Sequence, residues 1–82
     1  MAMVKPVLTV DVKGEMCPMP VLKTRQAIQQ VKVGEVIEVV ATDPASQPDL
    51  ESWARKTGNR IVLVETVGSN PVVYRFLIER VK

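Results

Sequence analysis

The sequence predicts an α/β two-layer sandwich of the α+β kind, in which two helices cover one face of a mixed four-stranded sheet. The apolar residues follow the order β-α-β-α-β-β along the chain. A predicted helix separates the first two strands, which favours their parallel pairing through a right-handed crossover. The 82 residues suffice for one compact domain. We therefore interpret residues 1–82 as a single domain without linker or repeat.

The first half of the chain predicts a strand, a helix and a second strand. Apolar and polar residues alternate over residues 7–12, as in a half-buried strand, and Lys13-Gly14-Glu15 ends it. Apolar or small residues then recur at three- and four-residue steps over residues 21–31, which predicts an amphipathic helix that ends near Gly34. Residues 36–41 are short and rich in β-branched side chains, and so predict the second strand.

A second helix is expected after the turn formed by Thr42-Asp43-Pro44. Ser46 is the candidate N-cap, and Asp49 follows three residues later as in a capping box. Gly58 is the expected left-handed stop. Trp53 lies on the apolar face of this helix and is expected in the core.

The last third of the chain predicts an antiparallel hairpin of residues 61–67 and 72–81, joined by a turn rich in glycine, asparagine and proline. Helices on a single face leave the other face of the sheet in water. Glu38, Arg75 and Glu79 fall inside predicted strands and agree with such a wet face.

Composition excludes several classes of function. The chain has one cysteine and no histidine, so it has neither an internal disulfide, nor a zinc site of the usual kind, nor a histidine base. We expect no cofactor and no metal. The net charge of +2 is spread along the chain, and we expect no direct nucleic-acid binding. The aliphatic runs are too short to span a membrane, and the N-terminus lacks a secretory signal. These features predict a soluble cytoplasmic protein with a reduced thiol.

The one feature with evident chemistry is Cys17, which follows a glycine loop at Gly14 and precedes a helix. Pro18 and Pro20 each push the preceding residue towards extended dihedrals, so we expect the helix to begin at Pro20, with Met19 at the cap position. Methionine offers no good acceptor, and the free N–H groups of the first turn favour a nearby anion. The pattern predicts an exposed, rigidly held thiol with thiolate character. The alternative is a cysteine that serves as a small buried hydrophobe.

Covalent carriage suits this thiol better than turnover chemistry. The chain has no resolving thiol for a redox cycle and no histidine base for acyl transfer, whereas a persulfide carrier needs an accessible thiolate and a docking surface. Lys23 and Arg25 follow the motif and either raise the local potential and guide a partner or are ordinary solvated charges. Asp43 ends the second strand, at the sheet edge to which the first strand brings the cysteine loop. Met19 and its neighbour Met16 either border an interface or fill the core.

The run Gly14-Glu-Met-Cys-Pro-Met-Pro-Val21, together with Gly34-Glu35 and Thr42-Asp43-Pro44, resembles the TusA family of sulfur carriers, also named SirA-like proteins. The resemblance implies the same two-layer fold and a persulfide on Cys17. It also implies a donor of the cysteine desulfurase or rhodanese-like class. The implied acceptor belongs to a relay for tRNA thiolation, molybdenum-cofactor assembly or sulfur oxidation. Arg25 and Asp43 stand where similar proteins carry charges that act in docking or around the thiol. Such a protein is a sulfurtransferase-like carrier rather than a self-sufficient enzyme.

Two other functions remain open from the sequence alone. The element order also resembles the C-terminal domain of a bacterial translation initiation factor, which suggests an RNA- or ribosome-associated module. In that case Tyr74 and Phe76 would have to stack bases from a strand face. A regulatory interaction domain that docks through the Cys-Pro-Met-Pro segment without carrying sulfur is the other alternative. One scaffold hosts unrelated activities, so the fold by itself does not separate them.

Overall fold

The computed structural model describes residues 5–82 and has the predicted element order. Residues 1–4 lie outside the described residues. They include most of the N-terminal segment for which the sequence predicted no secretory signal. The elements are β1 (Leu8–Val12), α1 (Met19–Ile28), β2 (Val36–Ala41), α2 (Ser46–Thr57), β3 (Arg60–Val67) and β4 (Val73–Glu79). In residues 5–82, no helix combines the length and apolar character needed to cross a membrane.

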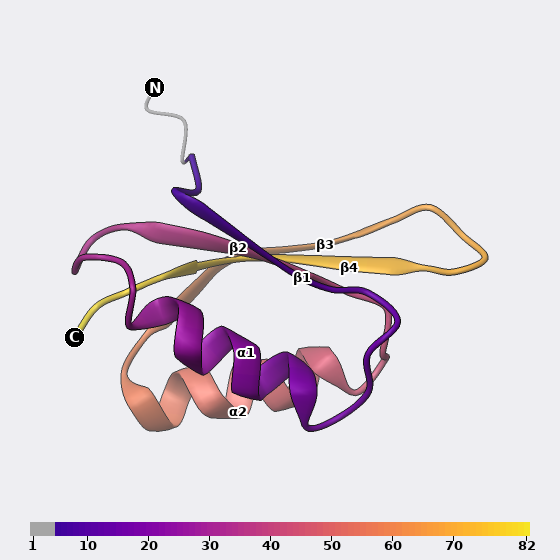
Figure 1. Ribbon diagram of the computed structural model, residues 1–82, viewed down its shortest axis with the longest axis horizontal. Helices are drawn as coiled ribbons and strands as arrows, with labels where there is room; N and C mark the ends of the chain where they lie inside the picture. Colours follow the sequence, from indigo (N-terminus) through magenta and orange to yellow (C-terminus); the bar gives the residue numbers. More distant parts are fainter. Residues whose placement is uncertain (1–4) are drawn as a thin grey trace.

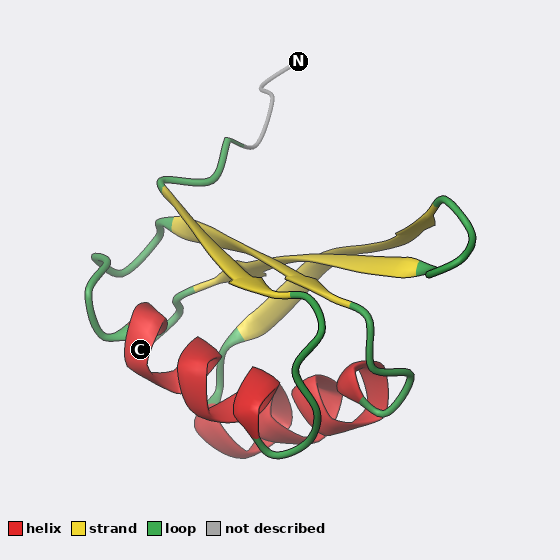
Figure 2. Cartoon of the chain, turned by 45° about the vertical axis from the view of Figure 1, so that its right-hand side comes forward, coloured by secondary structure: helices red, strands yellow, loops and turns green. Residues whose placement is uncertain are grey.

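The four strands form one mixed sheet in the order β1-β2-β4-β3. β1 pairs with β2 in parallel, with Leu8 opposite Ile37 and Val12 opposite Ala41. β4 lies antiparallel to both β2 and β3. Both helices lie on the same side of the sheet (Figures 1 and 2). The predicted two-layer sandwich is therefore confirmed, including the parallel first pair.

The core lies between the helices and the sheet face that they cover. Alternate residues of each strand point into it, because successive side chains of a strand face opposite sides. Phe76 at the centre of β4 is fully buried, and Trp53 is only 8% exposed, so the prediction that this tryptophan belongs to the core is confirmed. The other buried apolar residues of this cluster are Val12, Ala27, Ile28, Val31, Ile37, Val39, Ala41, Leu50, Ala54 and Ile78.

The opposite face of the sheet is polar at its centre, as predicted. Arg75 on β4 forms ion pairs with Glu38 on β2 and with Glu65 on β3, the latter at 2.7 Å. Thr9 on β1 donates a hydrogen bond to Glu38 at 2.9 Å. The hydrogen bond from the Arg75 guanidinium, helped by the one from Thr9, lowers the pKa of Glu38 below its ordinary value. A polar chain thus crosses all four strands.

The first helix is shorter than predicted at its C-terminal end. It stops at Ile28, whereas the apolar pattern extended to Val31. Val31 is still buried, but it lies in a bend that follows the turn at residues 29–30. Arg80 near the C-terminus donates a hydrogen bond to the Val31 carbonyl at 2.6 Å and accepts one from the Gly34 N–H at 2.7 Å. The backbone at Val31 and Gly34 must leave the helical conformation to make these two hydrogen bonds with Arg80. The helix therefore ends before Val31.

The start of α2 also differs from the prediction. Ser46 is the first helical residue and Ala45 occupies the cap position, so Ser46 is not the N-cap. The Ser46 hydroxyl is buried and has no hydrogen-bond partner among residues 5–82. Asp43 acts in its place, because its Oδ1 accepts the Ala45 N–H at 3.1 Å and its carbonyl accepts the Ser46 N–H at 2.9 Å. The predicted stop is confirmed, since Gly58 follows the helix with a φ of 78°.

Candidate functional site: the Cys17 loop

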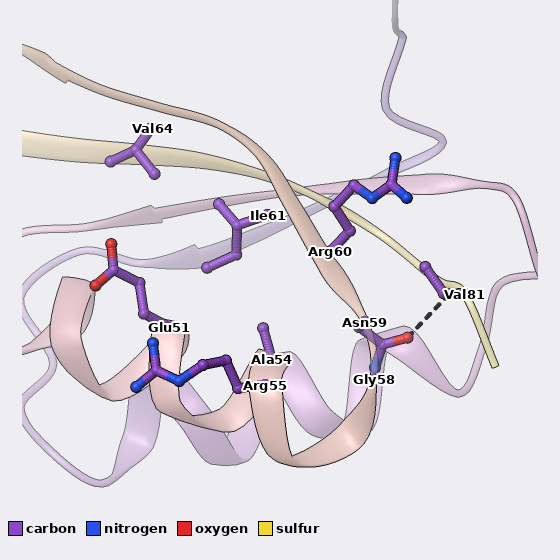
Figure 3. Close-up of a pocket in the computed structure, with 9 residues that line it drawn as sticks. All are labelled: Glu51, Ala54, Arg55, Gly58, Asn59, Arg60, Ile61, Val64 and Val81. Carbon is purple, nitrogen blue, oxygen red and sulfur yellow. Dashed lines mark hydrogen bonds between the residues drawn. The ribbon is translucent and has the colours of Figure 1, made fainter.

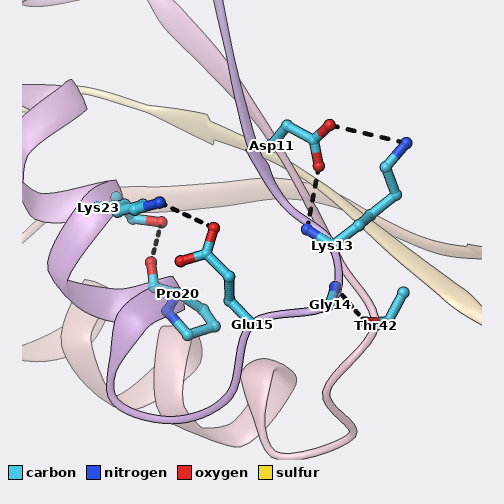
Figure 4. Close-up of polar contacts among 8 residues, drawn as sticks. Asp11, Lys13, Gly14, Glu15, Pro20, Lys23 and Thr42 are labelled. Carbon is cyan, nitrogen blue, oxygen red and sulfur yellow. Dashed lines mark hydrogen bonds and ion pairs between the residues drawn. The ribbon is translucent and has the colours of Figure 1, made fainter.

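The loop that carries Cys17 leaves β1 at the sheet edge where β2 also ends. Gly14 has a φ of 80°, a left-handed conformation that favours glycine. Its N–H donates a hydrogen bond to the hydroxyl of Thr42 at 2.9 Å, and the Glu15 N–H bonds the Val12 carbonyl at 3.1 Å. Figure 4 shows the Gly14 contact between the two strand ends. The expected proximity of the cysteine loop to the end of the second strand is thus present in the structure.

Asp43 fixes the backbone of Cys17. Its Oδ2 accepts the Cys17 N–H at 2.9 Å, while Oδ1 accepts the Ala45 N–H at the start of α2. One carboxylate therefore joins the thiol loop to the second helix. The thiol itself is free and exposed. The alternative of a buried structural cysteine is excluded by this exposure, and Asp43 lies in the immediate surroundings of the thiol.

The first helix begins one residue earlier than predicted. Pro18 occupies the cap position, and the helix starts at Met19 rather than at Pro20. The Met19 N–H donates to the Met16 carbonyl at 2.9 Å, a bond that extends the turn backwards. No side chain of the described residues caps this end of the helix, as expected. Pro20 is fully buried, and its carbonyl accepts the Thr24 hydroxyl at 2.7 Å, which anchors the first turn in the core (Figure 4).

The electrostatics of the thiol are opposite to the prediction. A hydrogen bond to the side chain of Asp49 raises the pKa of Cys17 above its ordinary value, and partial desolvation and the negative charges of Asp49 and Asp43 act in the same direction. A carboxylate that accepts the thiol hydrogen stabilises the neutral form. The two carboxylates therefore favour the neutral thiol, and the predicted thiolate character was wrong.

The basic residues near the motif do not offset these carboxylates. Lys23 forms an ion pair with Glu15 at 2.8 Å, and Lys13 lies 3.8 Å from Asp11 (Figure 4). Arg25 is exposed on α1, and no ion pair involves it in the part of the chain that the structure describes. A role of Lys23 or Arg25 in docking stays a prediction.

The two methionines beside the cysteine face solvent. Met16 is 74% exposed and Met19 is 37% exposed. Exposed methionines adapt to irregular surfaces, as an interface requires. Their exposure excludes the alternative in which they fill gaps in the core.

A shallow cleft of about 320 Å³ lies beside the thiol, between the start of α1 and one face of α2. Its lining residues are Cys17, Pro18, Val21, Asp49, Ser52, Trp53 and Lys56. Sequence reasoning missed the three polar members from α2. Their spacing does place them on one helical face with Trp53, but no local pattern shows that this face meets the cysteine loop.

A larger cavity, of about 710 Å³, opens on the other side of α2, towards β3 (Figure 3). Ile61 and Val64 contribute apolar side chains, while Glu51, Arg55 and Arg60 contribute charges. Cys17 is absent from its lining, so size alone does not identify the functional site. Within residues 5–82, no group of three or more potential acidic, histidine or cysteine ligands is placed to hold a metal ion.

A family model described as sulfurtransferase TusA matches residues 8–80. The chain belongs to the TusA family. The resemblance drawn from the Cys-Pro-Met-Pro motif is therefore confirmed over almost the whole chain. The family assignment supports a sulfur-carrier class of function and leaves the relay open.

Relatives within the TusA family have corresponding names. The sulfur carrier protein TusA of Allochromatium vinosum is 33% identical over 70 residues, which are 85% of this chain and 88% of that protein. The putative sulfur carrier protein YrkF of Bacillus subtilis is 44% identical over 66 residues, 80% of this chain. The match covers only 36% of YrkF, so this chain spans about a third of that relative's length.

The fold of this TusA-family chain resembles that of a SirA-like protein from Desulfitobacterium hafniense in its crystal structure. The TM-score is 0.70 at 24% sequence identity, and the match covers 90% of this chain and 99% of the other. At this identity the similarity concerns the fold alone. It agrees with the observed sheet of four strands covered by two helices.

Proposed function

We propose that the chain is a sulfur carrier that accepts sulfur as a persulfide on Cys17 and passes it to an acceptor protein. The observation that carries this proposal is the exposed thiol of the only cysteine, held at a loop tip through its own N–H by Asp43. Membership of the TusA family supports the same function. An exposed thiol beside an open cleft leaves room for a second sulfur atom and for the donor's cysteine.

Loading is a transfer between two sulfur centres. Cys17 loses its proton to solvent, and the resulting thiolate Sγ attacks the outer sulfur of a persulfide on the donor. A new Sγ–S bond forms, the S–S bond of the donor breaks, and the donor cysteine leaves as a thiolate. Unloading repeats these steps with an acceptor thiolate, and Cys17 becomes the leaving group. The outer sulfur moves without external oxidant or reductant, so the carrier itself needs no cofactor.

The remaining residues of the loop serve this transfer by holding or surrounding the thiol. Gly14 supplies the left-handed turn after β1, and Pro18 and Pro20 restrict the backbone on the far side of Cys17. Met16 and Met19 form an exposed apolar border for a partner protein.

The partners of the carrier belong to two chemical classes. The donor is a cysteine desulfurase or a rhodanese-like protein, which forms a persulfide on its own cysteine. The acceptor belongs to a cytoplasmic relay for tRNA thiolation, molybdenum-cofactor assembly or sulfur oxidation. Lys23 and Arg25 on α1 contribute to docking, in which Arg25 offers the less constrained charge because Lys23 is already paired with Glu15.

The proposal is tested by mass spectrometry of the intact protein. The reduced chain is incubated with a cysteine desulfurase and cysteine, and in parallel with a rhodanese and thiosulfate. The expected product has gained the mass of one or more sulfur atoms, loses them on treatment with dithiothreitol, and does not form with Cys17→Ala. Ser69→Ala in the exposed β3–β4 turn is the matched control and should load normally. If no donor of either class adds sulfur to the wild-type chain, the proposal is wrong.

The structure weakens the RNA-binding alternative. Phe76 is fully buried and Tyr74 packs against the core, so neither lies on the exposed sheet face as base stacking would require. The regulatory alternative predicts that Cys17→Ser binds a partner as well as the wild type does. A carrier predicts that this variant binds a sulfur-relay partner less well than the wild type does, and that it neither receives nor releases sulfur.

A further inference from the structure

The Asp49 carboxylate beside the Cys17 thiol has no part in the transfer steps of the carrier function. Asp49, in the first turn of α2, lines the same cleft as Cys17, and its carboxylate raises the pKa of the thiol. The cleft lies between the start of α1 and one face of α2, so the Asp49 carboxylate and the Cys17 thiol border a common space. The spacing from Ser46 suggested that Asp49 would cap its own helix, but no hydrogen bond from the Ser46 N–H to Asp49 is present, and that N–H is bonded to the Asp43 carbonyl. The Asp49 side chain is therefore free to serve the thiol.

We propose that Asp49 is a positioning residue for Cys17: its carboxylate holds the thiol hydrogen in the unloaded carrier, and this contact must break before sulfur is loaded. The inference rests on the proposed function for its biological meaning, whereas the shared cleft is a property of the fold. Asp49 touches neither the donor nor the transferred sulfur in this scheme. It acts through the orientation and protonation of Cys17.

The charges around the thiol explain why the contact favours the resting state. Asp43 approaches from the β2–α2 loop and Asp49 from α2, and both disfavour a negative charge on sulfur. Lys56 is the one cation that lines the cleft. On the side of α1 and its loop, Lys23 is paired with Glu15. The thiolate is therefore weakly supported until a partner alters these surroundings.

This arrangement has a consequence for loading. A thiol that stays protonated at neutral pH reacts slowly with oxidants and with incidental electrophiles, because the thiolate is the reactive form. A donor that presents a cationic side chain to the Asp49 carboxylate would release the thiol hydrogen and favour the thiolate at the moment of transfer. The contact thus restricts sulfur loading to docked partners.

The test follows the rate of Cys17 alkylation by iodoacetamide as a function of pH. Asp49→Asn removes the negative charge and should move the midpoint of the profile to lower pH. Its alkylation rate at neutral pH should rise about two- to tenfold, the range expected for loss of one hydrogen bond. Asp49→Glu keeps the charge and should restore most of the wild-type profile. Glu51→Gln is the control on the same helix, because Glu51 borders the cavity on the side of β3 and is absent from the Cys17 cleft.

Circular dichroism checks that each variant is folded. A second measurement uses the wild-type protein alone. The wild-type midpoint should lie at higher pH in the folded protein than in urea, since unfolding separates Cys17 from both carboxylates. An unchanged midpoint in Asp49→Asn, or equal midpoints for folded and unfolded wild type, would overturn the role of Asp49. The mass assay above distinguishes this failure from failure of the carrier function. If sulfur loads on Cys17 but the Asp49→Asn profile does not move, only the positioning role fails; if the profile moves but no donor loads sulfur, only the carrier function fails.

Discussion

Asp43→Ala should destabilise the protein more than the loss of an ordinary turn residue. The Asp43 carboxylate accepts two backbone hydrogen bonds, from Cys17 at 2.9 Å and from Ala45 at 3.1 Å. Hydrogen bonds to charged groups contribute about 1.5–3 kcal/mol each when buried. Asp43 is only half-buried, so water partly replaces the carboxylate in the variant. The bond from the Ala45 N–H is a turn bond before α2 rather than a side-chain cap, and an ordinary hydrogen bond contributes about 0.5–1.5 kcal/mol.

Together these values lead us to expect that Asp43→Ala lowers the free energy of unfolding by about 1–2 kcal/mol. For a domain of this size, each kcal/mol corresponds to a decrease in Tm of about 4–8 °C. The measurement is urea denaturation followed by circular dichroism and by the fluorescence of Trp53. Asp43→Asn keeps one side-chain acceptor and should lose about half as much, because one of the two N–H groups keeps its partner.

The matched control is Asp11→Ala. Asp11 also accepts a backbone N–H, from Lys13 at 3.0 Å, but it is exposed and the bond joins residues only two positions apart. We expect its loss to cost at most about 0.5 kcal/mol. Hydrogen exchange at the Cys17 and Ala45 amides should accelerate only in the Asp43 variants. Equal stability of Asp43→Ala and Asp11→Ala, with unchanged amide exchange, would refute the bridging role of Asp43.

Three further variants test the sheet, the core and the surface. Glu38→Gln should destabilise the protein at neutral pH, because contacts with Arg75 and Thr9 lower the pKa of Glu38 in the folded state. The difference in the free energy of unfolding between wild type and variant should begin to shrink below about pH 4.3, where Glu38 of the unfolded wild type takes up a proton. It should vanish once the pH has fallen through the lower pKa of Glu38 in the folded state. Urea titrations at several pH values measure this difference. Phe76→Ala should cost about 3–5 kcal/mol and abolish a cooperative thermal transition, since Phe76 is fully buried. Lys23→Ala should change the free energy of unfolding by less than about 1 kcal/mol, because its pair with Glu15 is still partly exposed to water; a larger, salt-insensitive loss would contradict that view.

The secondary structure was predictable where local patterns decide it. The bounds of β2, residues 36–41, coincide with the prediction, because β-branched residues between two turns leave few alternatives. The end of α1 was missed, since its apolar pattern continues to Val31 while hydrogen bonds of Arg80 hold that segment in a turn. The start of α2 was missed for a similar reason, because Asp43 takes the capping role expected of Ser46. In both cases a contact outside the helix overrides its own sequence signals.

The sequence by itself determined the fold class, the family and the position of the exposed cysteine, because turns, prolines and apolar periodicity act on neighbouring residues. Only the tertiary structure decided the chemistry around the thiol. Folding brings Asp43 and Asp49 from the following loop and helix to Cys17, and the pKa of a thiol responds to charges that are near in space, whatever their distance along the chain. For this reason the local motif suggested a thiolate, whereas the assembled site favours a protonated thiol.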